Sequence, residues 1–150
     1  AANASSINDG AAAVVVISAE KSAKLGMQPI CRIITQASIA QEPLYFTTAP
    51  GKAISKVLDK SSLSINDIDL FEINEAFSNV TLAAMRDHNI PHDKVNVHGG
   101  AVSLGHPIGA SGARILVTLI SALNQKDKKL GLATLCIGGG EAAAVIVEMI

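Results

Sequence analysis

The chain has 150 residues, of which 49% are hydrophobic and 17% are charged, and its formal net charge is −1. This length and composition predict one folded domain with a substantial core and exclude a disordered segment. The charge balance gives no electrostatic basis for binding nucleic acid or an acidic membrane. Two cysteines, Cys31 and Cys136, are too few for a disulfide framework, which favours a reducing compartment.

The sequence shows no signal peptide and no apolar run long enough to cross a bilayer. Residues 1–6 contain no initiating Met. We therefore expect the chain to be a fragment or a processed half of a longer protein.

The first half of the chain alternates predicted strands and helices. In chain order these are a strand buried on both faces (11–17), a short helix (18–26), a second strand (30–34), a loop (42–50) and an amphipathic helix (50–58). The first strand is predicted from a continuous apolar run with three valines. Ser18 and Gly26 suit the two ends of the short helix, and Pro50 suits the first turn of the longer one.

The second half continues the alternation. It contains a third strand (68–73), a helix (77–89), a short extended piece (95–97), a second helix that begins at Ser111, and two further strands (130–137 and 142–150). The helix after Ser111 is apolar almost all round, which predicts burial on all sides, as between two sheets. The short glycine link at 138–140 predicts an antiparallel hairpin. We expect an α/β domain with a mostly parallel five-stranded sheet.

His106 is the first candidate for chemistry. It lies in the stretch 98–114, which holds five glycines and leads directly into the apolar helix. Glycine loses the most backbone entropy on folding, so such a loop suggests close approach of the backbone to another group. Pro107 biases His106 to an extended backbone. A general base or an oxyanion donor is one interpretation, and a loop histidine beside a helix N-terminus is the other.

Cys136 is the second candidate, because it ends an apolar strand and precedes three glycines. A free cysteine in such a strand is usually a small core residue. The glycines can expose the thiol and direct backbone N–H groups at a substrate oxygen. A thiol with a pKa near neutral could remove a proton from the carbon beside a thioester. Together, Cys136 and His106 indicate acyl or thioester chemistry.

Asn74 and Glu75 follow the third strand, at the sheet edge where open α/β folds bind ligands. Asn74 could orient a water or an oxyanion, or it could cap the next helix. His88 and His92 are expected to be exposed, and Cys31 to be a core residue. The glycine spacing fits neither dinucleotide nor P-loop patterns, and no spacing predicts a metal site.

Four motifs in order resemble the C-terminal half of a thiolase, most closely the acetoacetyl-CoA thiolases (acetyl-CoA acetyltransferases). The resemblance runs over essentially the whole chain. The motifs are the opening Asn3–Ala12, the run Asn74–Phe77, the loop His98–Arg114 and the segment Cys136–Gly140. Ser6 stands where many members have glycine, which is a slight departure.

The resemblance implies a fold of two similar βαβαβαββ halves in five layers, with residues 1–150 forming the C-terminal half. The apolar helix would then pack against its counterpart from the other half. It also implies a homodimer or homotetramer, in the cytoplasm or alternatively in mitochondria. The nucleophilic cysteine that carries the acetyl group would lie in the N-terminal half, so this chain alone should be inactive.

The resemblance further implies the reaction and the role of each residue. Two acetyl-CoA molecules would give acetoacetyl-CoA and CoA, or the reverse, with no cofactor beyond the coenzyme A thioesters. His106 would activate the nucleophile, Asn74 would hold a water of the oxyanion hole, and Cys136 would take the α-proton. The Gly138 N–H would join a second oxyanion hole, and the Val102 carbonyl could contribute to a potassium site.

Three other interpretations stay open at this point. The chain could be a non-catalytic assembly domain that keeps the motifs, or part of a 3-ketoacyl-CoA thiolase with longer-chain preference. It could also belong to a related condensing enzyme such as a ketoacyl synthase. Those enzymes usually have a second histidine in place of the cysteine base, so Cys136 and the Asn74 motif argue against this last alternative.

Overall fold

The structure, a computed structural model, describes residues 2–150. Its centre is one four-stranded sheet with the strand order β1-β4-β3-β2. β2 and β3 are parallel, whereas β4 runs antiparallel to both of its neighbours. The strands are β1 (Cys31–Ala40), β2 (Leu70–Ile73), β3 (Leu130–Ile137) and β4 (Glu141–Met149).

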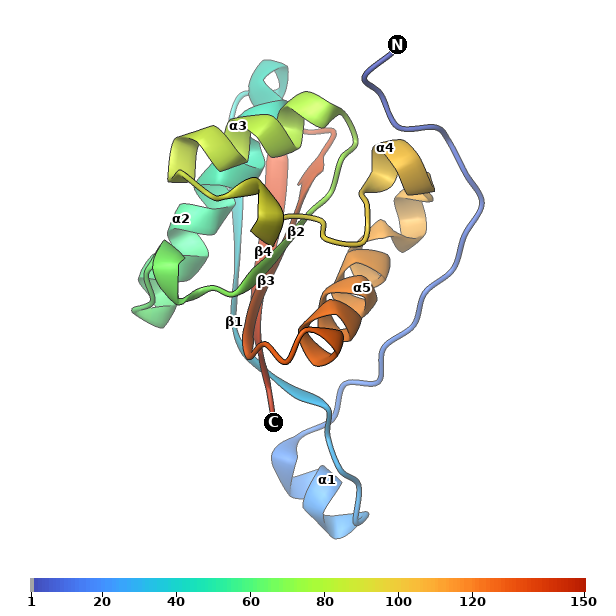
Figure 1. The fold of residues 1–150 in the computed structure, drawn as a ribbon, viewed down its shortest axis with the longest axis vertical. Coiled ribbons are helices and arrows are strands. Elements are labelled where there is room, and N and C mark those ends of the chain that lie inside the picture. Colours follow the sequence, from blue (N-terminus) through green and yellow to red (C-terminus); the bar gives the residue numbers. More distant parts are fainter. Residues whose placement is uncertain (1) are drawn as a thin grey trace.

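Helices cover both faces of this sheet (Figure 1). α2 and α3 lie on one face and α5 lies on the other, while the small helix α1 extends beyond the sheet. The helices are α1 (Ala19–Lys24), α2 (Ala49–Ser61), α3 (Ser78–His88), α4 (Ala101–Leu104) and α5 (Ser111–Gln125). Four short 3₁₀ helices join them, at Pro43–Thr48, Ile65–Asp67, His92–Lys94 and Ile108–Ala110.

Two apolar cores lie on the two faces of the sheet. The larger one, between the sheet and α2 and α3, includes Ile54 and Phe71. The smaller one, between the sheet and α5, includes Leu119 and Leu123. Successive residues of a strand point to opposite faces, so Leu70 joins the smaller core while Phe71 joins the larger.

The sheet differs from the expected one. It has four strands instead of five, and only one of its three neighbouring pairs is parallel. The missing strand is the first one, because residues 11–17 are extended without regular strand pairing, and Val15 and Val16 are 84% and 71% exposed. A strand of valines is buried on both faces only where it joins a sheet that other elements cover, and this segment joins no sheet within residues 2–150.

The environment of α5 also differs from the prediction. Ile115, Leu119 and Leu123 pack on the sheet, but Val117 is 42% exposed. The side of α5 that faces away from the sheet lines an apolar groove of about 670 Å³ with Leu116, Val117 and Ile120. The helix is therefore not buried on all sides, because this chain supplies one sheet for it to pack on and not two.

Several local predictions are confirmed. Ser18 caps α1 by accepting a hydrogen bond from the Lys21 N–H, and Pro50 lies in the first turn of α2. β3 and β4 form the expected antiparallel hairpin. His88 is half-buried and not exposed as expected, because its Nε2 lies 2.8 Å from the Gly51 carbonyl oxygen. No helix among residues 2–150 is long and apolar enough to cross a membrane.

Candidate active site

Asn74 is positioned by the parallel pair β2 and β3. Its N–H donates to the Thr134 carbonyl oxygen at 3.0 Å, so the strand pairing continues one residue beyond β2. The residue is 1% exposed. The N-cap of α3 is Phe77, which excludes the helix-cap interpretation of Asn74. The Asn74 side chain instead points to His106, with 3.5 Å between its Nδ2 and His106 Nε2.

The His106 backbone is tied to the first residues of the chain. Its N–H contacts the Ser6 carbonyl oxygen at 3.1 Å and Asn8 Oδ1 at 3.2 Å. Gly105 precedes it with φ +99°, and a Cβ built on Gly105 would lie 2.4 Å from Asn8 Oδ1. Only glycine fits both this conformation and this space. The glycine at 105 therefore lets the N-terminal segment approach and fix the loop that carries the imidazole.

Hydrogen bonds around the imidazole determine its neutral tautomer. The Ser111 hydroxyl donates to the Pro107 carbonyl oxygen at 3.1 Å, so its oxygen is left to accept. His106 Nδ1 lies 2.6 Å from that oxygen and must carry the proton of this bond. His106 Nε2 then carries a lone pair, which faces Asn74 Nδ2. The geometry presents Nε2 as a base.

The charge state of His106 agrees with this role. Burial, and secondly the positive charge of Arg114, lower the pKa of His106 below its ordinary value of 6.5. The imidazole is therefore neutral at pH 7, which is the form that can accept a proton. A neutral, oriented imidazole beside a buried amide suits general-base work on a nucleophile.

A buried ion pair lies behind Asn74. Glu72, which is 2% exposed, is on β2 and lies 3.4 Å from Arg114 Nη1 on α5. Arg114 Nη2 also donates to Asn74 Oδ1 at 3.3 Å. Burial, with a smaller contribution from the Glu75 carboxylate, raises the pKa of Glu72 to about 7 against the opposing effect of the Arg114 charge. The pair thus connects the sheet, the amide and α5.

The raised pKa of Glu72 predicts a pH dependence of stability. A carboxyl whose pKa is 4.5 when unfolded and about 7 when folded binds its proton more tightly in the folded chain. Its contribution to the free energy of unfolding is full below pH 4.5 and is lost as the pH rises through 7, a change of about 3 kcal/mol. The free energy of unfolding of Glu72→Gln, minus that of the wild type, should therefore increase as the pH rises from roughly 4 to 8.5, the range in which Glu72 titrates.

Urea unfolding of the chain at several pH values measures this effect. Comparison with the wild type removes contributions from other groups, including His106, whose lowered pKa acts with the opposite sign. Glu141→Gln, on an exposed residue, is the matched control. A stability difference between Glu72→Gln and wild type that stays constant with pH would contradict the assignment.

Cys136 lies at the same edge of the sheet as Asn74. Ile73 pairs with Thr134 in the parallel register, so strand geometry puts the backbones of Asn74 and Cys136 about 6 Å apart. No hydrogen bond among residues 2–150 joins the Cys136 thiol to His106 or Asn74, so their convergence on one cavity stays a prediction. Burial raises the pKa of Cys136, so the thiol is protonated at neutral pH in this chain.

The glycines after Cys136 form the tight turn between β3 and β4. Gly140 has φ +88°, and a Cβ there would lie 2.3 Å from the Gln41 carbonyl oxygen. Gly138, in contrast, has nothing within 4 Å of a built Cβ. Gly140 is therefore required by the turn, whereas Gly138 leaves open space in front of its backbone.

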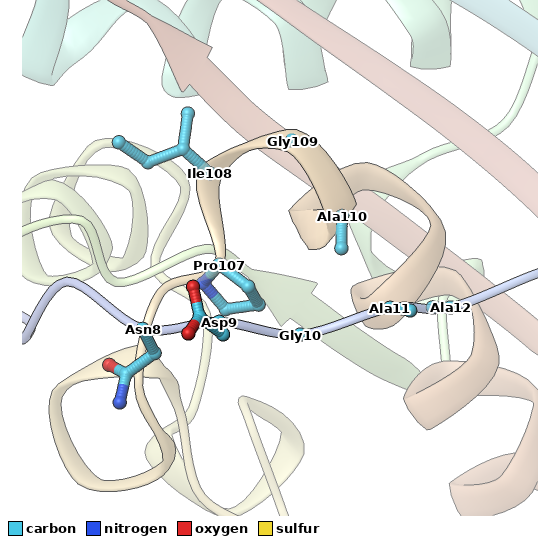
Figure 2. Close-up of a pocket in the computed structure, with 9 residues that line it drawn as sticks. All are labelled: Asn8, Asp9, Gly10, Ala11, Ala12, Pro107, Ile108, Gly109 and Ala110. Carbon is cyan, nitrogen blue, oxygen red and sulfur yellow. The ribbon is translucent and has the colours of Figure 1, made fainter.

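A pocket of about 390 Å³ adjoins the His106 loop, between residues 8–12 and residues 107–110. Figure 2 shows the Pro107 ring lying against the chain at Gly10, where a Cβ would come within 2.8 Å of it. The pocket is lined by neither His106 nor Cys136. The pocket is therefore an open space beside the loop, and the side chains proposed to react lie outside its lining.

Glu75 holds the first part of the glycine loop, near Gly100 and Val102. Its carboxylate accepts from the Val102 N–H at 3.2 Å and from Asn96 Nδ2 at 3.1 Å. A Cβ on Gly100 would lie 2.2 Å from the Glu75 carboxylate. These contacts hold α4, a short helix that sequence reasoning missed within the loop, against the end of β2.

Sequence reasoning also missed four residues that hold the site together: Asn8, Glu72, Ser111 and Arg114. A charged residue within the apolar stretch of β2 was the available signal for Glu72. Ser111 and Arg114 lie three residues apart in the first turn of α5, so they point to one side of the helix. No local signal identified Asn8, because its contact spans 98 residues of sequence.

The comparisons with known proteins agree with each other. The family model described as "Thiolase, C-terminal domain" matches residues 27–149. Acetyl-CoA acetyltransferase 1 of Arabidopsis thaliana is 51% identical over 148 residues, which are 99% of this chain and 36% of that protein. The mitochondrial acetyl-CoA acetyltransferase of Rattus norvegicus is 53% identical, over 99% of this chain and 34% of that protein. The chain thus spans a little over a third of its relatives' length.

Solved structures show the same relationship. The Bacillus anthracis acetyl-CoA acetyltransferase has a TM-score of 0.96 and 43% identity, covering 99% of this chain and 38% of that one. The Acat5 thiolase of Ascaris suum, solved in complex with coenzyme A, has a TM-score of 0.89 and 42% identity, with the same coverage of both chains. The resemblance drawn from the four motifs is confirmed. The chain belongs to the thiolase family and carries its C-terminal domain.

Proposed function

We propose that this chain is the C-terminal catalytic part of an acetyl-CoA C-acetyltransferase. The complete enzyme would join two acetyl-CoA molecules into acetoacetyl-CoA and CoA, or run the thiolytic reverse. The observation that carries the proposal is the contact between Asn74 Nδ2 and His106 Nε2, with the opposite ring nitrogen bonded to Ser111. The relatives named acetyl-CoA acetyltransferase support the substrate class.

In the first half-reaction, His106 Nε2 would take the proton of a cysteine thiol supplied from outside this chain. The thiolate would attack the carbonyl carbon of acetyl-CoA, and the C–S bond to CoA would break. The departing CoA thiolate would take the proton from His106. Asn74, through a bound water, would donate to the oxyanion that forms on the carbonyl oxygen.

In the second half-reaction, the Cys136 thiolate would remove an α-proton from another acetyl-CoA. The resulting enolate, held by the Gly138 N–H, would attack the acetyl-enzyme carbonyl carbon. The bond to the nucleophilic sulfur would break, and that sulfur would recover the proton from Cys136. Because burial raises the pKa of Cys136, the rest of the enzyme or the bound thioester must stabilise this thiolate.

The apolar groove supports the thiolase N-terminal half as the partner. Val15, Val16, Leu116 and Ile120 contribute to its lining, and 84% of the Val15 surface is exposed. A continuous apolar surface of this kind marks an interaction site. We propose that the N-terminal half covers it, that the complete enzyme is a homodimer or homotetramer, and that it works in the cytoplasm or in mitochondria.

For potassium, the resemblance points to the Val102 carbonyl in the glycine loop. An alkali ion takes a shell of several oxygens, so other oxygens would have to join that carbonyl. No step is assigned to the ion, and the reaction proposed here uses only the coenzyme A thioesters and the groups named above.

Reconstitution tests the proposed function. This chain is joined to the N-terminal part of the Arabidopsis relative that its match does not cover, and a second hybrid uses the rat relative. Each hybrid should cleave acetoacetyl-CoA in the presence of CoA, followed as loss of the enolate absorbance. The chain alone should show no turnover, because it lacks the acyl carrier.

The outcomes separate the alternatives. Two hybrids that fold, by circular dichroism and intact assembly, yet show no thiolysis would contradict catalysis and indicate an assembly domain. A higher kcat/KM on longer 3-ketoacyl-CoA substrates would indicate a long-chain thiolase. Turnover by the chain alone would contradict the need for an external nucleophile.

A further inference from the structure

Arg114 occupies a place that the proposed reaction does not use. Its side chain is 18% exposed and reaches from α5 to the end of β2, where it contacts Glu72 Oε2 at 3.4 Å and Asn74 Oδ1 at 3.3 Å. Arg114 Nε and Glu72 Oε1 are buried without a hydrogen-bond partner among residues 2–150. Burying a cation and a carboxyl with unsatisfied atoms is costly. A packed apolar pair would hold α5 on the sheet at less cost.

The contact with Asn74 determines which way the amide points. An asparagine amide has an oxygen on one side and an NH₂ group on the other, and both orientations have nearly the same shape. Arg114 carries only N–H donors, so it donates to the amide oxygen and disfavours the NH₂ group in that position. With Oδ1 facing Arg114, Nδ2 must face His106 Nε2, as observed at 3.5 Å.

The same cation acts on His106 at longer range. After burial, the Arg114 charge is the second cause that lowers the pKa of His106. The other charged groups on elements near the imidazole are Glu72 on β2, Glu75 after β2 and Asp9 on the N-terminal segment. Arg114 is the cation in this group, so its removal should raise the pKa of His106.

We propose that Arg114, supported by Glu72, is a positioning residue that orients the Asn74 amide toward His106. This inference rests on the proposed function, because it assigns the amide and the imidazole to the reaction. Arg114 itself touches neither the thioester nor the reacting atoms. Its effect passes through Asn74, so the two residues should not act independently.

A double-mutant cycle in the active hybrid tests this coupling. Arg114→Met, Asn74→Ala and the double variant are compared at pH 9, where His106 is neutral in all of them. Loss of one oxyanion donor lowers kcat by about 10²- to 10³-fold, and we expect this for Asn74→Ala. Arg114→Met should lower kcat about tenfold to hundredfold, with little change in KM. In the double variant, Arg114→Met should cause no further loss.

Two further variants separate charge from geometry. Arg114→Lys keeps the positive charge but loses the planar fork, so it should lower kcat while leaving the acid limb of the kcat/KM profile in place. Arg114→Met should move that limb to higher pH. Arg86→Met, on an exposed arginine of α3, is the control for loss of an arginine and should leave both unchanged. Effects of Arg114→Met and Asn74→Ala that multiply in the double variant would overturn the proposal.

Nuclear magnetic resonance on the chain gives a readout that does not need turnover. In the wild type the Asn74 Nδ2 protons should show nuclear Overhauser contacts to the His106 ring, and the His106 ring should titrate below 6.5, its ordinary pKa. In Arg114→Met the amide should lose its fixed orientation and the His106 pKa should rise. If neither changes, the positioning role is wrong. If both change while the wild-type hybrid is inactive, the proposed function fails and the positioning role holds.

Discussion

Replacing His106 with alanine should lower kcat/KM of the hybrid enzyme by about 10³-fold or more. The reason is that His106 Nε2 is the base proposed to take the proton of the nucleophilic thiol and to pass it to the departing CoA thiolate. The variant should also fail at the first half-reaction. Incubation with acetyl-CoA should leave the nucleophile unmodified, measured as no acetyl gain in the intact mass.

His92 provides the matched control, since it is an exposed histidine in the short 3₁₀ helix His92–Lys94. His92→Ala should keep near-normal rates. His106→Gln keeps a hydrogen-bond donor but has no basic nitrogen. It should therefore be as impaired as His106→Ala in activating the nucleophile. An His106→Ala enzyme that acetylates at the wild-type rate would show that the imidazole has no role in activating the thiol.

Replacing Cys136 with alanine should produce a different defect of comparable size, about 10²- to 10⁴-fold in kcat. The thiol is proposed to move the α-proton in the second half-reaction, so the first should survive. Acetyl-CoA should therefore acetylate the nucleophile normally, and the acetyl-enzyme should accumulate. Cys136→Ser should behave like Cys136→Ala, because a hydroxyl is a far weaker acid than a thiol.

Cys31→Ala is the control for cysteine loss, because Cys31 begins β1 and packs partly against the core near α5. It should leave both half-reactions intact. Near-normal condensation by Cys136→Ala, or failure to form the acetyl-enzyme, would contradict the division of labour between the two residues. The pair of variants thus distinguishes an activating group from a deprotonating one.

The sequence predicted the elements that depend on local pattern. The Ser18 cap, the proline in the first turn of α2 and the β3–β4 hairpin follow from residues within a few positions of one another, and each is confirmed. The prediction for residues 11–17 was wrong about their setting. An apolar run indicates a preference for burial, but burial needs other elements to cover the segment, and the pattern cannot show whether these residues are covered.

The candidate site divides in the same way. His106 and Asn74 stood out because of the glycines and the strand end beside them, but the sequence could not decide between a helix cap and a site role for Asn74. That decision needed the position of Phe77 at the N-cap of α3 and the contact of Asn74 with His106, 32 residues away. Glu72, a charged residue inside an apolar stretch, was a usable signal of a buried partner, but the partner itself, Arg114, lies 42 residues away in the sequence.

The tether between the N-terminal segment and the His106 loop bears on how this protein divides into modules. The family model begins at residue 27, yet Ser6 and Asn8 hold the backbone of His106. Cutting the polypeptide at the boundary of the matched domain would detach the imidazole from its anchor. The transferable unit for grafting or exchange is therefore larger than the domain, and must begin upstream of the asparagine that occupies the space left by Gly105.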